Sequence, residues 1–365
     1  MELKIGQCIV QARHKNKITQ AELANFLGVS KAAVSKWESG ASYPDITILP
    51  KIATYFNLSI DDLIGYEPQM TKEEIRKTYI RLRNRFETDT PKEVLEECES
   101  LIQKYYSCFP FLKQMAVLFM NHANLFEKPD LLYDKALFLI ERVRTHSDNA
   151  DEVKESINLQ ATIYILTNQP ERALEIVDET IKPTIPDIEL VAQIQHLMGE
   201  TKKASATYQI AIYQHVISLI SDASPYLLLH ASNAPRAKEI INRTLAVAKA
   251  FQLNRLHPNS MLNFYLTAAQ IYCLYQETEN ALSMLEEYGN ICKKYLFPVT
   301  LHGDDFFDEL DAWFEEFDIG NGAPRGNALI QESLIAAIRN NPAFSLLQNQ
   351  PRFQTLLQQL EQLNC

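Results

Sequence analysis

Glycine is scarce in this chain of 365 residues, in which it occurs 10 times, about 3% against a usual share of about 7%. So little glycine argues against β-barrels, glycine-rich nucleotide-binding loops and disorder. The scarcity of glycine suits a protein made mostly of helices, and hydrophobic residues make up 46% of the chain. At roughly 100–200 residues per domain, the length allows two or three domains.

Long apolar runs are absent as well. No stretch approaches the ~18 uninterrupted apolar residues of a membrane-spanning helix, and the first residues hold no apolar run long enough for a signal peptide. The six cysteines are scattered, without a Cys-x-x-Cys pair, which predicts reduced thiols and no zinc site. We therefore expect a cytoplasmic protein that binds neither a membrane nor a metal.

Signatures of catalysis are also missing. The eight histidines show no ligand spacing such as His-Glu-x-x-His, and neither a nucleophile elbow nor a nucleotide-binding fingerprint occurs. The glycine-containing stretch 320–326 lacks the Gly-Lys-Ser/Thr ending of a phosphate loop and does not follow a strand pattern. We interpret that stretch as a flexible turn. The sequence predicts neither an enzyme nor a cofactor.

Charge is unevenly distributed along the chain. Its 35 Lys and Arg residues against 46 Asp and Glu residues give a net charge of -11, which by itself opposes binding to nucleic acid. From Leu3 to Trp37, however, six bases accompany one acid, Glu22, whereas residues 89–365 hold 22 bases and 36 acids. The sequence therefore predicts a basic head on an acidic remainder, and such a remainder favours neutral or basic ligands.

Hydrophobic spacing predicts five short helices between the N-terminus and Gly65. Thr19 followed by Glu22 is the signature of a capping box, and Gly28 suits the end of the helix that begins there. Ser30 is a typical N-cap for the next helix. Two helices of about eight residues are thus joined by Gly-Val-Ser, which is the pattern of a helix-turn-helix.

The second helix of this pair is predicted to have a buried and an outward face. Val34 and Trp37 belong to the buried face. The outward face consists of Lys31, Ala32, Ser35 and Lys36. A helix with a short basic face fits the major groove of DNA, which is about 12 Å wide. A protein-binding module or an inactive remnant is the alternative, and the flanking lysines suit either a phosphate contact or simple solvation.

These motifs closely resemble the helix-turn-helix of phage-repressor/Cro-like (XRE-type) regulators. The resemblance extends from the N-terminus to about Gly65 and rests on residues 19–24, 28–30, 34–40 and 44–45. It implies that two side chains at helix N-termini bind phosphates of double-stranded DNA, namely those of Gln20 and Ser30. It further implies that three side chains face base edges, those of Lys31, Ala32 and Lys36, with Ser35 beside them. Arg13 and Glu38 match a pair that forms a structural salt bridge in this family.

A basic helix is predicted after Pro68, because proline cannot lie inside a helix. From Thr71 to about Glu87 this segment holds six bases and three acids. We assign residues 67–90 to a linker helix that follows a DNA-binding domain of residues 1–66. The bases suit an exposed connector, which is the preferred interpretation, or contacts with the DNA backbone.

From Pro91 onward, the sequence predicts helices of about 12–20 residues, an ordinary length in globular proteins, separated by short loops. A similar core opens alternate helices, at Asp134–Ile140, Glu171–Val177 and Glu279–Leu285. Weaker copies of this core stand at Ala204 and Ala237, and with these two the central alanines recur at intervals of 37, 31, 33 and 44 residues. These intervals are scattered about 34 residues, the period of tetratricopeptide repeats. Ahead of two of these alanines stand a tyrosine and a further alanine at constant offsets, which predicts small–aromatic–small packing between antiparallel helices.

The predicted fold class is all-α, with a five-helix repressor-like DNA-binding domain followed by a tetratricopeptide-like helical repeat superhelix. The repeats would span residues 91–300 and capping helices residues 301–365. A helical bundle without repeats is the alternative. Within 304–318, aromatic spacing predicts one helix with a buried aromatic face and a solvated acidic face. Two final helices are predicted over about 328–340 and 351–363.

A repeat superhelix presents a concave surface that suits extended peptides. Seven polar side chains are predicted to line it: Asn121, Asn124, Asn158, Thr162, Gln193, Asn263 and Gln270. Because an amide both donates and accepts, a row of amides satisfies the backbone of a bound peptide. Each of these residues also suits a plain surface or capping position.

The whole layout resembles the RRNPP group of cytosolic peptide-pheromone receptors from Gram-positive bacteria, through its architecture rather than through motifs. This resemblance implies a homodimeric transcription regulator that binds a palindromic operator and senses a short signalling peptide in quorum sensing. The alternative is an adaptor, in which the DNA-binding domain tethers repeats that bind a partner protein and no small ligand.

Overall fold

The computed structural model describes residues 4–66, 68–177, 180–181 and 185–363, and over these residues it consists of helices without a strand. The chain forms two compact units. The first comprises Met1–Glu74 and Glu96–Leu112, and the second comprises Ile75–Leu95 and Lys113–Cys365. The predicted all-α class is confirmed, whereas the predicted domain limits at residues 66, 90 and 300 stay predictions.

Five short helices precede Gly65, as predicted. They are α1 (Ile5–Lys15), α2 (Gln20–Leu27), α3 (Lys31–Glu38), α4 (Leu49–Phe56) and α5 (Ile60–Ile64). Each helix contributes at least one buried apolar side chain to a shared core, including Ile9, Leu23, Val34, Ile52 and Leu63. The core therefore fixes the relative placement of these five helices within the first unit.

Helix α1 approaches the end of α3 closely at Gly6. A Cβ atom on Gly6 would lie 2.3 Å from the carbonyl oxygen of Trp37, far inside van der Waals contact. Only a residue without a side chain lets α1 pack this closely against the C-terminal end of α3. Gly6 thereby helps to set how α3 is held in the domain.

Helices α6 (Lys72–Thr88), α7 (Pro91–Lys104) and α8 (Phe109–His122) each contribute residues to both units. Helix α6 is the predicted linker helix. Within the second unit, Arg76 Nη2 donates to the carbonyl oxygens of Glu315 (2.6 Å) and Phe317 (2.7 Å). Arg83 Nη1 donates to the carbonyl oxygen of Ala323 (2.8 Å). These guanidinium groups are engaged inside the protein, which supports the connector rather than the DNA-backbone interpretation.

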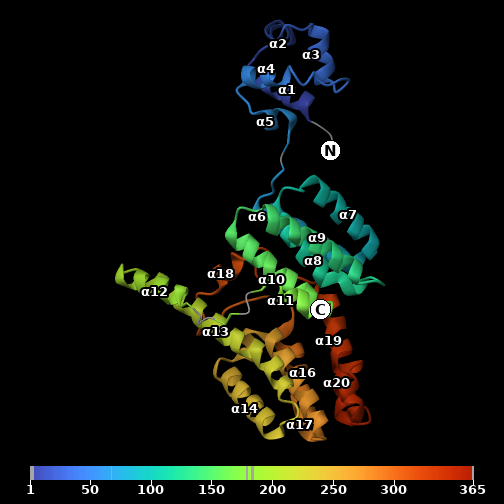
Figure 1. Ribbon diagram of the computed structural model, residues 1–365, viewed down its shortest axis with the longest axis vertical. Coiled ribbons are helices and arrows are strands. Elements are labelled where there is room, and N and C mark those ends of the chain that lie inside the picture. Colours follow the sequence, from blue (N-terminus) through green and yellow to red (C-terminus); the bar gives the residue numbers. More distant parts are fainter. Residues whose placement is uncertain (1–3, 67, 178–179, 182–184, 364–365) are drawn as a thin grey trace. The chain divides into compact units, whose positions relative to one another are not determined.

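The rest of the second unit is built from helices that pair along the chain, with α9 beside α10, α12 beside α13 and α16 beside α17 (Figure 1). The elements are η1 (Ala123–Leu125), α9 (Asp130–His146), α10 (Ala150–Leu166), α11 (Pro170–Leu174), α12 (Asp187–Leu197), α13 (Thr201–Leu229), α14 (Ala234–Ala250), α15 (Leu253–Leu256), α16 (Pro258–Leu274), α17 (Thr278–Ile291), η2 (Cys292–Leu296), α18 (Asp311–Glu315), α19 (Asn327–Arg339), η3 (Pro342–Leu347) and α20 (Pro351–Glu361).

The predicted small–aromatic–small packing is present at two places. The residues concerned are Ala161, Tyr164 and Ala173 in one buried cluster, and Ala269, Tyr272 and Ala281 in another. An alanine at each helix crossing leaves room for a tyrosine ring beside it. The packing prediction is confirmed at these sites, and the assignment to tetratricopeptide repeats stays a prediction.

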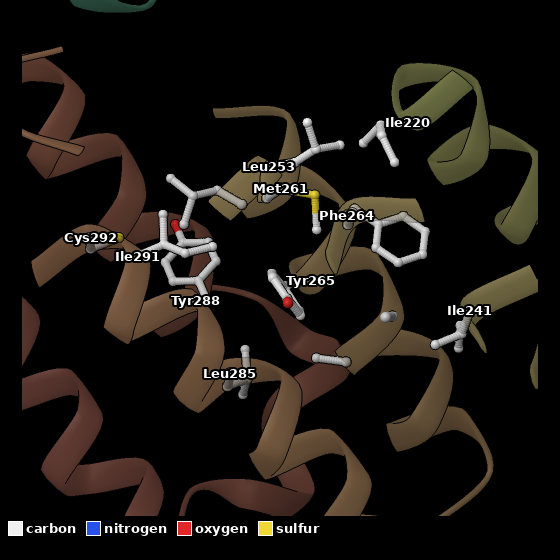
Figure 2. Packing of buried hydrophobic residues seen from close by; sticks show 14 of the residues in the cluster. Ile220, Ile241, Leu253, Met261, Phe264, Tyr265, Leu285, Tyr288, Ile291 and Cys292 are labelled. Atoms are coloured by element: carbon white, nitrogen blue, oxygen red, sulfur yellow. The ribbon is translucent and has the colours of Figure 1, made fainter. Parts of the chain in front are cut away.

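The largest core of the second unit lies around α16. Figure 2 shows Ile220 of α13, Ile241 of α14, Phe264 of α16 and Leu285 of α17 within this cluster. Tyr288 of α17 is also buried there, and its hydroxyl donates to the carbonyl oxygen of Leu334 in α19 at 3.2 Å. The C-terminal helices are therefore part of this core.

Residues 304–318 do not form the predicted single helix, and only α18 within them is α-helical. Oδ1 of Asp304 accepts hydrogen bonds from the backbone N–H groups of Phe306 (3.0 Å) and Phe307 (2.9 Å). This local turn competes with helix formation because it satisfies those donors itself. Phe307 and Phe314 are buried, but Phe306 is 62% exposed. The prediction of one continuous aromatic helix face is therefore wrong.

Two further helix predictions are resolved by the structure. Helix α13 has 29 residues and contains Pro225, so it is longer than any helix that the sequence predicts. The two final helices appear as α19 and α20, close to their predicted limits. Over the part of the chain that the structure describes, none of the helices is both long and apolar enough to traverse a bilayer.

Candidate nucleic-acid interface

The helix-turn-helix is fixed by its caps. Thr19 Oγ1 accepts from the N–H of Glu22 (3.2 Å), and Glu22 Oε2 accepts from the N–H of Thr19 (2.6 Å), which completes the predicted capping box. Helix α2 ends at Gly28 with a φ of 71°, a left-handed conformation that glycine adopts without strain. The chain then turns directly into α3, whose N-cap is Ser30.

Helix α3 divides into the two predicted faces. Val34 and Trp37 are buried in the core of the first unit. The side chains on the opposite face are exposed, and they are Lys31, Ala32, Ser35 and Lys36. The structure therefore brings the four residues of the predicted outward face onto one accessible helix surface. Their contacts with bases stay predictions.

Arg13 and Glu38 form the predicted salt bridge. Arg13 Nε donates to Glu38 Oε1 at 2.8 Å, and only 7% of the Glu38 side chain is exposed. Burial alone would raise the pKa of Glu38, but hydrogen bonds from Arg13 and Gln20 and the charge of Arg13 outweigh burial and hold that pKa below its usual value. The pair ties α1 to the end of α3, so Arg13 is part of the scaffold.

Gln20 has a partner that the sequence did not predict, because its Nε2 donates to Glu38 Oε2 at 2.7 Å. One N–H of this amide is thereby used inside the domain. The second N–H is chemically able to bond a phosphate, since a primary amide carries two donors. The predicted phosphate contact of Gln20 stays a prediction, with a structural role beside it.

Ser30 occupies the N-terminus of α3. Its Oγ accepts from the backbone N–H of Ala33 at 3.2 Å. Because the cap uses this hydroxyl as an acceptor, its own hydrogen is still able to point toward a phosphate oxygen. The exposed start of α3 also presents backbone N–H groups and the positive end of the helix dipole, which favour an anion.

One exposed residue near this surface was missed by sequence reasoning. Tyr43, in the loop after α3, is 54% exposed and offers a hydroxyl that suits a phosphate oxygen. It lies outside the helical periodicity on which the sequence analysis depends. An aromatic residue placed between two predicted helices, shortly after the predicted outward face, was the signal available for it.

The residues predicted to bind a peptide are spread over several helices of the second unit. Asn158, Gln193 and Asn263 are exposed on α10, α12 and α16, and Gln270 is half-buried on α16. Thr162 is exposed but donates to the carbonyl oxygen of Asn158 at 2.8 Å. These positions leave the side chains accessible, and their joint use as one groove stays a prediction.

The two earliest predicted peptide contacts lie at the end of α8 and in η1. Asn124 is exposed in η1. Asn121 is half-buried, donates from Nδ2 to the carbonyl oxygen of Val117 at 2.9 Å, and lines a cavity. The other six predicted residues are not among the described residues that line this cavity.

Comparisons with known proteins agree with the geometry of the first unit. The family model described as helix-turn-helix matches residues 9–63, from α1 to α5. The HTH-type transcriptional activator BcrR of Enterococcus faecalis is 38% identical over 72 residues, which are 20% of this chain and 35% of BcrR. The chain thus spans about a third of the length of that relative.

A second relative is matched over most of its length. The cryptic phage CTXphi transcriptional repressor RstR of Vibrio cholerae is 32% identical over 81 residues, which are 22% of this chain and 70% of RstR. Among solved structures, Bacillus thuringiensis PlcR in complex with the peptide PapR7 and DNA aligns with 80% of this chain and 95% of its own, at 15% identity and a TM-score of 0.28. A TM-score that low does not establish a shared fold.

Both curated relatives are transcription regulators by name, in agreement with the prediction that the chain is not an enzyme. The family match coincides with the five helices whose caps, core and exposed α3 face are described above. With RstR matched over 70% of its length at 32% identity, the chain belongs to the helix-turn-helix family of DNA-binding transcription regulators.

Proposed function

We propose that the chain is a sequence-specific transcription regulator that reads DNA with the outward face of α3. The observation that carries this proposal is the exposure of Lys31, Ala32, Ser35 and Lys36 on one side of a helix whose other side is buried. Lysine suits the O6 and N7 acceptors of guanine, and an alanine methyl suits the methyl group of thymine. Gln20 and Ser30 would bind phosphates at the starts of α2 and α3.

Fluorescence anisotropy on DNA from upstream of the chain's own gene tests the base contacts. We expect Lys31→Ala and Lys36→Ala each to weaken specific binding by about 1–3 kcal/mol, because each removes a base contact. Lys249→Ala, an exposed lysine of α14 in the second unit, is the matched control. Unchanged operator affinity in both α3 variants would contradict the assignment.

We further propose that the regulator acts as a homodimer, because one recognition helix reads one half-site and a palindromic operator presents two. Helix α12 offers a surface for this role. Five apolar side chains form an exposed stripe along it: Leu190, Val191, Ile194, Leu197 and Met198. Their spacing puts them on one side of the helix, whereas Ala192 is buried. Exposed apolar patches of this kind mark interaction sites.

Light scattering coupled to gel filtration tests the dimer. A dimer has about twice the mass of the 41.8 kDa chain. We expect Ile194→Glu combined with Leu197→Glu to give the monomer mass and to weaken operator binding. Leu229→Glu, which charges an equally exposed leucine at the end of α13, should leave the dimer intact. A dimer that survives the double substitution would refute this interface.

We also propose that the helical domain senses a short signalling peptide through the seven polar residues predicted above. Their accessibility on α8, η1, α10, α12 and α16 supports this role, since exposed amides and hydroxyls bond an extended backbone. Peptide binding would change DNA affinity only if it favours one arrangement of the two DNA-binding heads over another.

A gel shift with and without spent culture medium tests the sensing role first. Once a cognate peptide is known, titration calorimetry with Asn158→Ala and Asn263→Ala tests the groove, and wild-type affinity in both variants would reject it. The adaptor alternative predicts no effect of the medium and co-purification of a folded partner protein instead.

A further inference from the structure

The second unit contains a cavity of about 380 Å³ beside the N-terminus of α16. Its walls come from the start of α16, residues 296–301, residues 321–325 and α19. Most of the lining is apolar and includes Leu262, Leu296, Val299 and Leu334. Cavities of about 300–1,000 Å³ with mostly apolar walls and a few polar groups are typical of small-ligand sites.

One cation lies in this apolar wall. Arg325 lines the cavity, and its Nη1 donates to Ser333 Oγ, another lining atom, at 3.0 Å. Its Nε is buried and has no hydrogen-bond partner among the described residues. Burial lowers the pKa of Arg325, which the neighbouring carboxylate of Glu332 only partly offsets. A buried guanidinium donor without a partner is costly unless an acceptor reaches it.

The lining has no negative group to match Arg325. None of the described lining residues is an aspartate or a glutamate, although the chain as a whole carries a net charge of -11. Burial, together with the charges of Arg325 and Arg83, lowers the pKa of His122 to about 4, so this buried ring is neutral near pH 7 and Arg325 and Arg83 are the cations of this region. His257 Nδ1 accepts from the N–H of Ser260, so the neutral ring carries its proton on Nε2.

We propose that this cavity binds an apolar ligand that carries one carboxylate, with the carboxylate held by the guanidinium of Arg325. The guanidinium fork matches a carboxylate, and its one hydrogen bond among the described residues is that of Nη1 to Ser333. The apolar walls hold the hydrocarbon part. The free C-terminus of an apolar peptide and a small organic acid share this chemistry. The inference deepens the ligand-sensing role proposed above and rests on it for its biological purpose.

The cavity wall is bonded to α6. Tyr79 and Arg83 of α6 donate to the carbonyl oxygens of Pro324 (3.0 Å) and Ala323 (2.8 Å), two residues that line the cavity. Helix α6 follows the DNA-binding domain directly in the sequence. A ligand against residues 321–325 therefore contacts the segment to which this helix is hydrogen-bonded.

Isothermal titration calorimetry on the full chain without DNA tests the proposal. Four probes are titrated: 4-phenylbutyrate, its primary amide, the tripeptide Leu-Leu-Phe, and the same tripeptide with an amidated C-terminus. Each acid should bind at least about tenfold more tightly than its amide, because a charge-assisted hydrogen bond is worth about 1.5–3 kcal/mol. Tighter binding of the tripeptide acid would identify a peptide end as the source, and tighter binding of 4-phenylbutyrate a small acid.

Three variants locate the site. Arg325→Gln should reduce the affinity for each acid to that for its amide, and Leu262→Trp should abolish binding of all four probes by filling the cavity. Arg243→Gln, at an exposed arginine of α14, should bind as the wild type does. If circular dichroism shows that Arg325→Gln is unfolded, Ser333→Ala replaces it, with an expected loss of about threefold or more for the acids only.

Equal affinity for acid and amide, binding of none of the four probes, or full acid affinity in a folded Arg325→Gln variant would each overturn the proposal. Because calorimetry uses no DNA, these outcomes do not depend on the DNA-reading role. Conversely, a chain that binds the acids but fails to bind its upstream DNA would refute the regulatory function and leave the cavity site standing.

Discussion

At the scale of single residues, the buried carboxylate of Glu38 organises the five-helix domain formed by α1 to α5. We call this domain the DNA-binding head. It accepts hydrogen bonds from Arg13 of α1 and from Gln20 at the start of α2. Three helices are thereby tied through one side chain. If this shared acceptor is removed, the donors of Arg13 and Gln20 are left without a hydrogen-bond partner. The resulting loss of stability is larger than the net contribution of the hydrogen bonds themselves.

We predict that Glu38→Ala destabilises the DNA-binding head by about 1–3 kcal/mol, because Arg13 and Gln20 lose their shared acceptor. Urea unfolding followed by the fluorescence of Trp37, which is buried in this head, measures the change in a Trp313→Phe background, because the chain has two tryptophans. Glu22→Ala removes only the exposed half of a capping box and serves as the control with a smaller loss. Equal losses in the two variants would contradict a special role for Glu38.

The same carboxylate makes stability depend on pH. The pKa of Glu38 is lower in the folded protein than its ordinary value, so the unfolded chain binds the proton more readily. The stability contributed by Glu38 is therefore complete above about pH 4.3, the ordinary glutamate value, and is lost as the pH falls below it. In urea titrations from pH 6 to pH 3, the wild type should lose more stability than Glu38→Gln, and parallel losses would rule this out.

At the scale of elements, close approaches decide how helices are placed. Gly6 lets α1 approach the end of α3 closely, because a Cβ atom at this position would lie 2.3 Å from a backbone oxygen. Helix α6 holds residues 315–323 through guanidinium groups that donate to backbone carbonyls. Two of these carbonyls, of Glu315 and Phe317, lie at and just beyond the C-terminal end of α18, where helix carbonyls need partners.

We predict that Gly6→Ala destabilises the DNA-binding head by about 1–3 kcal/mol, since the added methyl group meets backbone that has to shift. Ordinarily, glycine to alanine inside a helix is stabilising, so the sign of the change is informative. Gln11→Ala, at an exposed position of the same helix, should change stability by less than about 0.5 kcal/mol. Thermal unfolding would decide, and a stabilised Gly6→Ala variant would contradict the close approach.

We also predict that Arg76→Ala destabilises the second unit by about 1.5–3 kcal/mol, because three backbone carbonyls lose a charged donor. Chemical denaturation followed by the fluorescence of Trp313, which lies in α18 just before residues 315–323, reports on this unit in a Trp37→Phe background, because the chain has two tryptophans. The exposed Arg243 of α14 supplies the control substitution Arg243→Ala. If the two variants unfold at the same urea concentration, α6 does not stabilise the C-terminal segment.

At the scale of the whole molecule, charge is divided between the parts. The head carries a basic face on α3, whereas residues 89–365 hold 14 more acids than bases. An acidic helical domain is repelled by DNA, so we expect the proposed DNA contact to be confined to the head. The cavity beside α16 differs from the acidic domain around it. It has a cation in its wall and no acid among its described lining residues. The expectation of neutral or basic ligands, drawn from the total charge, does not extend to this cavity.

If DNA contacts only the DNA-binding head, few phosphates are neutralised, and we predict a modest salt dependence of DNA binding. A plot of log affinity against log salt has a slope set by the number of phosphates neutralised. Lys17→Ala, at an exposed position before α2, should reduce the slope by about 1 per head if that lysine binds a phosphate. Lys154→Ala in α10 should leave the slope unchanged. A slope altered by Lys154→Ala would show that the helical domain contacts DNA.

The sequence by itself determined those features that local chemistry controls. The capping box at Thr19, the turn at Gly28 and the division of α3 into faces follow from neighbouring residues, because caps, turns and helical periodicity act over three to seven positions. The alanine and tyrosine spacing likewise predicted how two helix pairs pack. Local helical periodicity also explains why the structure contains the five predicted N-terminal helices and the two predicted final helices, α19 and α20.

Only the tertiary structure decided what depends on residues far apart in the chain. The bond from Gln20 to Glu38 gave a predicted phosphate ligand an internal partner. The cavity around Arg325 joins four segments between residues 256 and 334 with Asn121, and no periodicity links them. Such contacts depend on the packing of the whole unit, since a side chain's partners across a core are set by the fold and not by its neighbours in sequence.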